Sequence, residues 1–238
     1  MDNKKLKLSL IIPCYNESEN IKLLVDRISK IEYFIDEIIL VNNGSTDTTG
    51  IIVEKLIYGK SNYKLINIKI NVGYGDGIMS GVREASGDII AWTHADLQTD
   101  PQDVIDVFNA YVNYPDFKSS IIKGKRIKRN FFDFFFTYCM SLLSSFLLKV
   151  KVSDVNAQPK MFHRNFLNRL KNYPKDFSLD LYLLYTAKIN HYKVYEHPVY
   201  FKKRMLGMSK GGGTILGKIY LIKNTIKYIL NLKSKMKK

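Results

Sequence analysis

Three polar side chains of the kinds that bind metal ions stand at alternate positions after a run of apolar residues. His94, Asp96 and Gln98 follow the run Ile89–Thr93. Successive side chains of an extended chain point to opposite faces, so alternate residues share a face and can meet one cation. Oxygen ligands suit Mg²⁺ or Mn²⁺, which usually keep several waters and bind substrate phosphates. The pattern favours a divalent-cation site, and a polar strand end without a metal is the alternative.

A glycine-rich loop at Gly73–Gly77 has the spacing G-x-G-x-G. It follows the third apolar run of the chain, whereas the dinucleotide-binding fingerprint follows the first strand of its fold. The loop therefore resembles that fingerprint only loosely, and an ordinary turn explains it as well. Its place beside other polar loops would let its backbone approach a nucleotide or a sugar.

A basic segment near the end of the sequence combines cations with glycines. Lys202, Lys203 and Arg204 follow a strand-like pattern, and Lys210 precedes three glycines. Arginine and lysine side chains in such a segment could clamp a diphosphate. A solvated basic loop is the alternative interpretation.

The polar loops follow apolar runs of the buried-strand type, and helical patterns separate these runs. The runs are Leu8–Ile12, Glu37–Val41, Leu65–Ile68 and Ile89–Thr93. Strands that alternate with helices indicate a parallel sheet covered on both faces. Ligands of such sheets bind beyond the carboxyl ends of the strands, where the polar loops fall. We therefore expect an α/β fold with a mainly parallel sheet and a binding site at that edge.

The second half of the sequence is less regular than the first. It predicts a short strand, a long apolar helix, an extended segment, a further helix, a last strand and a basic helix. In that order these elements lie near 121–123, 131–150, 155–163, 179–187, 192–199 and 214–232. Because no internal repeat or low-complexity linker occurs, we expect one main domain at 1–213 and a basic amphipathic helix or tail at 214–238.

The chain is strongly basic. It has 238 residues, 46% of them hydrophobic, enough for one sizeable core, and its formal net charge is +15. Such a charge indicates anionic partners such as phosphates, nucleic acid or acidic lipid. Eleven Lys or Arg and no acidic residue occur from 202 to 238. The two cysteines, Cys14 and Cys139, lack the spacing of a zinc site or a disulfide framework, which fits a reducing cytoplasm.

Two segments have features of helices that lie on a membrane. Phe131–Val150 is apolar, but only about fifteen residues separate Asp133 from Lys149, fewer than the roughly 20 of a spanning helix. We therefore expect it not to span, and to be a core helix, an oligomer face or an interfacial helix. In Thr214–Leu232 an isoleucine stripe is flanked by lysines without any acid, which favours anionic lipid over docking on the domain.

Seven segments resemble the family-2 glycosyltransferases, and within them the polyprenyl-phosphate sugar transferases of the dolichyl-phosphate mannose synthase type. They are IIPCYNESENI, ILVNNGSTDTT, NVGYGDGIMSGVREASGDII, HADLQTDP, KGKR, SDVNAQPKMF and PVYFKKRMLGMSKGG. The resemblance covers about residues 7 to 213, and seven matches in family order are far more specific than one. It implies a GT-A-type nucleotide-sugar-binding fold and hexosyltransferase activity for residues 1–213.

The resemblance also implies roles for single residues. Those expected to contact the nucleotide sugar are Pro13, Tyr15, Glu17, Asn43, Gly73, Asp96 and Ser209. Those expected to bind Mg²⁺ or Mn²⁺ on the diphosphate are Asp96, Gln98 and His94. Those expected to carry catalysis are Asp96, Arg126, Arg204 and Lys210. Arg126 would lie near the acceptor phosphate, and Arg129 is a further candidate for that place.

The sequence departs from the family pattern at two places. The family usually has paired aspartates where this chain has Asn42-Asn43, and Asp-Ala-Asp where this chain has His94-Ala95-Asp96. An asparagine carbonyl still accepts a hydrogen bond from a base N–H, but the lost charge weakens the inference about the base. Histidine in place of aspartate removes a negative ligand, so the cation would depend on Asp96, Gln98 and the donor phosphates.

These features predict transfer of a sugar from a nucleoside-diphosphate sugar to a polyprenyl phosphate, with inversion at the anomeric carbon. The acceptor phosphate is already anionic near neutral pH, so the reaction needs little general-base help. The expected partners are a nucleotide sugar, a polyprenyl phosphate and an anionic membrane surface, without nucleic acid. We expect a cytoplasmic protein on the inner face of the cell membrane that serves cell-envelope glycan synthesis.

Two other functions fit parts of the sequence. Transfer to a hydroxyl of a surface glycan would require a positioned base, for which Asp180 is the candidate. A basic nucleic-acid-binding protein would explain the charge but not the ordered loop motifs, and it predicts a steep dependence of binding on salt.

Overall fold

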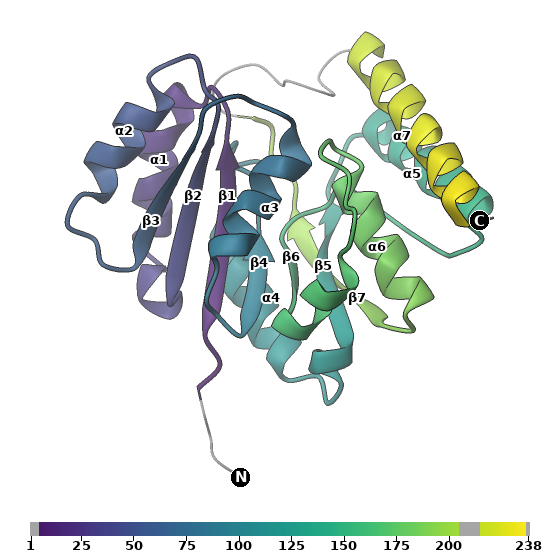
Figure 1. Ribbon diagram of the computed structural model, residues 1–238, viewed down its shortest axis with the longest axis horizontal. Helices are drawn as coiled ribbons and strands as arrows, with labels where there is room; N and C mark the ends of the chain where they lie inside the picture. The colour runs from purple at the N-terminus through teal and green to yellow at the C-terminus, as the bar shows by residue number, and fades with distance from the viewer. Residues whose placement is uncertain (1–4, 205–214, 237–238) are drawn as a thin grey trace.

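The computed structural model describes residues 5–204 and 215–236, and its centre is one seven-stranded sheet (Figure 1). The strand order is β3-β2-β1-β4-β6-β5-β7. The strands are β1 Leu8–Cys14, β2 Glu37–Asn43, β3 Tyr63–Ile68, β4 Ile89–Trp92, β5 Ser120–Ile127, β6 Lys160–His163 and β7 Lys193–Tyr200. Only β6 runs antiparallel to its neighbours, β4 and β5, so the expected mainly parallel sheet is confirmed.

Helices cover both faces of the sheet, as the alternation of strand and helix patterns predicts. They are α1 Ser18–Ile28, α2 Thr49–Ile57, α3 Tyr74–Glu84, α4 Gln102–Val112, α5 Phe131–Leu148, α6 Leu179–Ile189 and α7 Ile215–Met236. Short 3₁₀ turns lie at Glu32–Phe34, Phe117–Ser119 and Arg164–Arg169. The two faces of the sheet therefore belong to separate hydrophobic cores.

Alternate residues of β1 point into these two cores. Leu10 and Ile12 pack with side chains of α1, α2 and α4, whereas Ile11 packs on the opposite face with α3 and α6. Successive strand residues point to opposite faces, so a strand buried on both sides has to be apolar throughout. This requirement explains why the β1 segment of the sequence is a continuous apolar run rather than an alternating one.

The parallel register brings the carboxyl ends of the first strands to one edge. Cys14 at the end of β1 lies beside Asn42 of β2, and Asn43 lies beside Ile68 of β3. The loops after β1, β2, β3 and β4 therefore leave from the same edge. In the strand order, β7 is the outermost strand on the side away from β3. Figure 1 shows α5 and α7 on that side of the molecule, away from α1 and α2.

Helix α5 exposes a large aromatic surface. Phe131, Phe132 and Phe146 are 73%, 71% and 82% exposed. Among the residues that the structure describes, α5 is the one helix long and apolar enough to cross a membrane, with 18 residues and a mean hydropathy of 1.6. By length and composition alone, this helix could therefore cross a membrane, and the expectation that it does not span stays a prediction.

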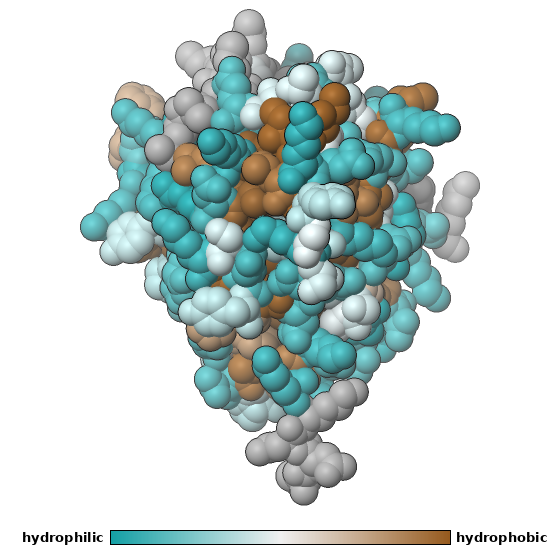
Figure 2. Space-filling view, turned by 90° about the vertical axis from the view of Figure 1, so that its left-hand side faces the viewer, coloured by the Kyte–Doolittle hydropathy of each residue, from teal (hydrophilic) through white to brown (hydrophobic). Residues whose placement is uncertain are grey.

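The face on the side of α2 and β3 differs from the surface of α5. It is mostly hydrophilic, with hydrophobic residues between polar ones (Figure 2).

Helix α7 docks on the domain, next to α5 (Figure 1). Ile229 is fully buried in the core that also contains side chains of α3 and α6, and Tyr228 and Leu232 pack against that core. The expectation that the isoleucine stripe faces lipid is therefore wrong at Ile229. Lys223 and Lys227 are exposed on the same helix, so its basic side chains still face outward.

Candidate active site at the carboxyl edge of the sheet

The predicted metal-binding residues lie in a turn and not on a strand. Strand β4 ends at Trp92, and Leu97 has a left-handed backbone conformation with φ 57°. His94, Asp96 and Gln98 are nevertheless all half-buried, while Ala95 and Leu97 between them are buried. Burial thus alternates along this segment, but a turn rather than a strand produces the alternation.

Asp96 presents one carboxylate oxygen to a cationic group. Its Oδ1 accepts a hydrogen bond from Gln98 N at 3.1 Å, and its Oδ2 lies 4.0 Å from Arg204 Nη1. In the part of the chain that the structure describes, no three His, Cys, Asp or Glu side chains cluster as a metal site. A single carboxylate fits Mg²⁺ or Mn²⁺ that takes its other ligands from a diphosphate and water.

The other two predicted metal ligands have partners of their own. Gln98 Nε2 donates to Lys202 O at 3.3 Å, and Lys202 N donates to Gln98 O at 2.8 Å. His94 Nε2 lies 3.0 Å from Tyr74 Oη. Burial lowers the pKa of His94, against the opposing effect of Asp96 and Asp180. Of the predicted set, Asp96 is the residue whose surroundings fit a cation best.

Glu17 and Arg204 form a close ion pair at this edge. Arg204 Nη2 lies 2.6 Å from both carboxylate oxygens of Glu17, which is 8% exposed. Asn20 Nδ2 also donates to Glu17 Oε2 at 2.6 Å. Arg204 thus lies between Glu17 and Asp96, residues predicted to hold the nucleotide and the cation. Ser209 and Lys210 lie outside the described residues.

The remaining predicted nucleotide contacts line the same edge. Pro13 and Tyr15 are half-buried at the end of β1. Asn43 is 3% exposed; its Nδ2 donates to Gly73 O at 3.1 Å, and its Oδ1 has no hydrogen-bond partner among the described residues. Gly73 has φ 145°, and a Cβ there would lie 2.3 Å from Lys175 O, so this position requires glycine.

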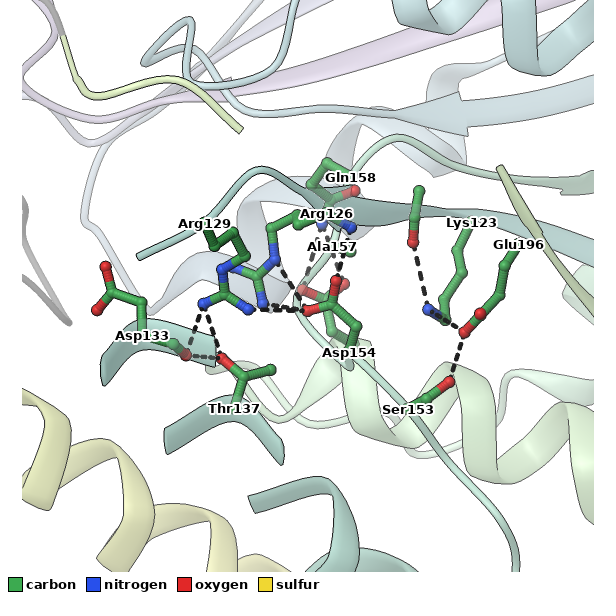
Figure 3. Close-up of polar contacts among 12 residues, drawn as sticks. Lys123, Arg126, Arg129, Asp133, Thr137, Ser153, Asp154, Ala157, Gln158 and Glu196 are labelled. Atoms are coloured by element: carbon green, nitrogen blue, oxygen red, sulfur yellow. Dashed lines mark hydrogen bonds and ion pairs between the residues drawn. The ribbon is translucent and has the colours of Figure 1, made fainter. Parts of the chain in front are cut away.

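A second cluster of charged side chains lies at the end of β5 (Figure 3). Arg126 donates to Asp154 from its backbone N at 2.8 Å and from Nε at 2.9 Å, and its Nη2 makes a further bond to Asp154 Oδ1. Burial raises the pKa of Asp154, but the charge and hydrogen bonds of Arg126 outweigh burial, so the pKa lies below its ordinary value.

Arg129 completes this cluster at the start of α5. Its Nη1 lies 3.7 Å from Asp154 Oδ1, and its Nη2 donates to Asp133 O at 2.9 Å and to Thr137 Oγ1 at 2.8 Å. Arg129 Nε is buried without a hydrogen-bond partner in the described chain. Two arginines share one aspartate, so the group keeps a net positive charge. Phe201 lies against both guanidinium groups, at 5.0 and 5.8 Å from its ring centroid.

Sequence reasoning missed the buried ion pairs behind these residues. Lys160 is fully buried with its Nζ 2.9 Å from Asp180 Oδ1, and Lys123 is 1% exposed with its Nζ 2.9 Å from Glu196 Oε1. Asp180 is itself 1% exposed. Asp180, the candidate base for transfer to a hydroxyl, is thus buried and paired with Lys160 in this structure, and its role as a base stays a prediction.

The chain is similar in sequence to known glycosyltransferases. Residues 9–170 match the model of glycosyl transferase family 2. A dodecaprenyl-phosphate galacturonate synthase of Rhizobium johnstonii is 26% identical over 71% of this chain and 51% of its own length. An undecaprenyl-phosphate 4-deoxy-4-formamido-L-arabinose transferase of Proteus mirabilis is 36% identical over 41% of this chain and 31% of its own length. The chain spans about half or less of the length of these relatives.

Solved structures share the fold at low sequence identity. Glucosyl-3-phosphoglycerate synthase from Mycobacterium tuberculosis, in complex with Mn²⁺, uridine diphosphate and glucosyl-3-phosphoglycerate, has a TM-score of 0.73 at 16% identity, covering 95% of this chain and 79% of that chain. A mannosyltransferase from Pyrobaculum calidifontis, in complex with GDP-Man and Mn²⁺, has a TM-score of 0.65 at 19% identity, covering 87% and 59%. These likenesses confirm the expected GT-A-like fold. Because the family model matches well over half of the chain, this protein belongs to glycosyl transferase family 2.

Proposed function

We propose that this chain transfers a sugar from a nucleoside-diphosphate sugar to a polyprenyl phosphate at a membrane surface. Its family and the names of its relatives support the reaction class. The observation that carries the proposal is the location of Arg126 and Arg129 next to α5. Arg126 is at the end of β5 and Arg129 is in the turn that leads into α5, the helix with the exposed aromatic surface. With Asp154 between them, the two arginines keep a net positive charge. A phosphate on an apolar chain needs these two surfaces side by side.

On the donor side, Glu17 and Asn43 hold the nucleotide, and Asp96 holds Mg²⁺ or Mn²⁺ with Gln98 nearby. When bound, the cation neutralises charge that develops on the departing diphosphate. Arg204 already lies at 2.6 Å from Glu17 and 4.0 Å from Asp96, so its guanidinium is within reach of the same diphosphate. From its place between these two carboxylates, Arg204 stabilises the leaving group.

On the acceptor side, Arg126 and Arg129 bind and orient the phosphate. Arg129 Nε offers a buried N–H that has no partner in the described chain, and a phosphate oxygen satisfies it. The acceptor oxygen attacks the anomeric carbon from the face opposite the diphosphate, which inverts that centre. Because the phosphate is already anionic, the step needs no general base, and the burial of Asp180 is consistent with this.

The membrane-facing surface consists of α5 and the exposed lysines of α7. Aromatic side chains of α5 enter the interface between lipid headgroups and acyl chains, and Lys223 and Lys227 attract anionic headgroups. Each basic residue near such a surface contributes about 1 kcal/mol. We propose that the protein lies on the inner face of the cell membrane with α5 in the interface.

The test is a thermal-shift screen of nucleotide sugars with and without Mn²⁺, followed by a transfer assay with undecaprenyl phosphate. A ligand that binds only the native state raises its stability, so a donor should raise the Tm, and more so with Mn²⁺. Product should form with the lipid phosphate and not with the free polyprenol. Absence of any Tm shift and of any transfer would overturn the proposal, and tight salt-dependent binding of DNA or RNA would then favour a nucleic-acid partner.

A further inference from the structure

Tyr74 is the centre of a hydrogen-bonded cluster behind His94. Its Oη lies 3.0 Å from His94 Nε2, 3.1 Å from Gln158 Nε2 and 3.5 Å from Asp180 Oδ2. Its ring stacks on Phe177 with centroids 4.8 Å apart and an angle of 12° between planes. The tyrosine is thus held by its ring and by its hydroxyl, and it fixes one nitrogen of His94.

The orientation of the Gln158 amide follows from its neighbours. Gln158 is 1% exposed, and its Nε2 faces both oxygens of Asp180, at 3.4 and 3.3 Å, as well as Tyr74 Oη. Turning the amide would place its carbonyl oxygen against a carboxylate. Gln158 therefore donates to Tyr74, and the single hydroxyl hydrogen of Tyr74 goes to another partner.

Two acceptors lie within reach of this hydrogen, His94 Nε2 and Asp180 Oδ2, and we assign it to His94. The contact with His94 Nε2 at 3.0 Å is within ordinary hydrogen-bond distance, whereas the contact with Asp180 at 3.5 Å is at its limit. Asp180 also has other donors, Lys160 Nζ at 2.9 Å from its Oδ1 and Gln158 Nε2 at 3.3 Å from its Oδ2. With Tyr74 donating, Nε2 is an acceptor, and a neutral imidazole then carries its hydrogen on Nδ1. A protonated imidazole would carry a hydrogen there as well.

This arrangement leaves His94 no lone pair for a cation. Nε2 uses its lone pair for Tyr74, and Nδ1 carries a hydrogen, although Asp96 two residues later fits a cation. We propose that His94 is a hydrogen-bond donor to an oxygen of the nucleotide sugar, through Nδ1–H, and that Tyr74 is the positioning residue that sets this tautomer. The inference deepens the proposed function and rests on it, because its ligand is the sugar donor of that reaction.

The chemistry at this position is therefore reversed relative to the family. An aspartate accepts hydrogen bonds or binds a cation, whereas His94 donates one. The oxygen that it meets is on the diphosphate, the ribose or the transferred sugar. Binding of the nucleoside diphosphate alone, compared with binding of the whole nucleotide sugar, separates these sources: an effect on both places the oxygen on the nucleotide, and an effect on the second alone places it on the sugar.

The first experiment compares two variants of nearly equal shape. His94→Asn keeps an N–H donor near the place of Nδ1, and His94→Asp offers only acceptor oxygens. Calorimetry with chelator present measures the affinity for the nucleotide sugar. It should be close to wild type for His94→Asn and about tenfold weaker for His94→Asp, the usual effect of one lost hydrogen bond. Equal affinities of the two variants would overturn the proposal.

The second experiment measures Mn²⁺ itself, by the electron paramagnetic resonance of the free ion. Mn²⁺ affinity in the presence of the nucleoside diphosphate should be the same in wild type and His94→Asn, whereas Asp96→Asn should lose it. A loss of Mn²⁺ affinity in His94→Asn, similar to that in Asp96→Asn, would show that His94 is a ligand. If wild type binds no nucleotide sugar at all, the proposed function fails and this inference fails with it.

Tyr74→Phe tests the positioning role. Without the hydroxyl, the imidazole is free to adopt the other tautomer. The affinity for the nucleotide sugar should therefore fall when His94 is present. The same substitution should have no effect on donor affinity once His94 is Asp, because the two residues act through one hydrogen bond. Additive losses would show that Tyr74 acts on structure alone, and melting temperatures of all variants check that they fold.

Discussion

The two ends of the site hold their charges in different ways. At the carboxyl edge of β4, Asp96 is half-buried and accepts a hydrogen bond from the neighbouring Gln98 N, with one oxygen turned toward Arg204. At the end of β5, Arg126 and Asp154 are already joined by three hydrogen bonds, and both are largely buried. A cation adds to the Asp96 carboxylate in the first group, whereas an anionic ligand competes with an existing ion pair in the second. Loss of a carboxylate should therefore affect binding at the first end and folding at the second.

The largest effect is expected from Asp96→Ala. Removal of the carboxylate that holds the cation should lower kcat/KM for transfer by about a thousandfold, because stabilisation of leaving-group charge contributes several kcal/mol. The melting temperature should change little. Glu54→Ala, which removes an exposed carboxylate on α2, is the control and should keep full activity. Near-normal transfer by Asp96→Ala in the presence of chelator would show that Asp96 holds no cation that the reaction needs.

The opposite pattern is expected from Asp154→Ala. Its removal leaves Arg126 and Arg129 without their shared partner, and breaking a buried pair costs about 3 kcal/mol of unfolding free energy. Urea denaturation measures this loss. Asp116→Ala breaks the surface pair with Lys193, whose side chain is 68% exposed, and should cost less than about 1 kcal/mol. Equal destabilisation by the two variants would contradict the distinction between the two ends.

A smaller effect is expected at the membrane. Replacing both Lys223 and Lys227 by alanine should weaken binding to anionic vesicles about thirtyfold, since each contributes about 1 kcal/mol. Co-sedimentation at low salt measures it, and high salt should reduce the difference. Replacing Lys22 and Lys55, which are exposed on α1 and α2, should leave binding unchanged. Point substitutions suit this test better than truncation at residue 214, because Ile229 is part of the core.

The smallest effect concerns acid stability. Burial raises the pKa of Glu196, but hydrogen bonds from Ser153 and Lys123 and the charge of Lys123 outweigh it and lower the pKa from 4.5 to about 2. A lowered carboxyl pKa stabilises the fold above 4.5, and this contribution is lost as the pH falls from 4.5 towards 2. Glu196→Gln should therefore flatten the dependence of Tm on pH in that window. An unchanged slope would mean that the pair with Lys123 contributes nothing.

The sequence predicts the first half of the fold well because its signals are local. Apolar runs such as Leu8–Ile12 are buried on both faces, and the loops after them contain the glycines and amides that mark strand ends. In the second half, β5 and β7 could be located, but the antiparallel direction of β6 could not, because direction depends on partners far away in the sequence. The docking of α7 had no signal either, since a buried stripe and a lipid-facing stripe have the same period.

The site shows the same division between local and distant information. Asp96, Glu17 and Arg204 could be predicted from motifs, and the structure brings them together at one edge. Tyr74 and Asp154 could not be, although both lie in segments that resemble the family. Their importance comes from partners 20 and 28 residues away, His94 and Arg126, and no spacing rule links such pairs.

The segment that follows β7 joins the two ends of the site. Phe201 lies against Arg126 and Arg129, and three residues later Arg204 binds Glu17 beside Asp96. A donor that draws Arg204 away from Glu17 strains the short chain back to Phe201, and an acceptor that moves the arginines strains it from the other side. Free-energy linkage between two ligands is reciprocal. If the sugar donor changes the affinity for the acceptor by some factor, the acceptor changes the affinity for the sugar donor by the same factor.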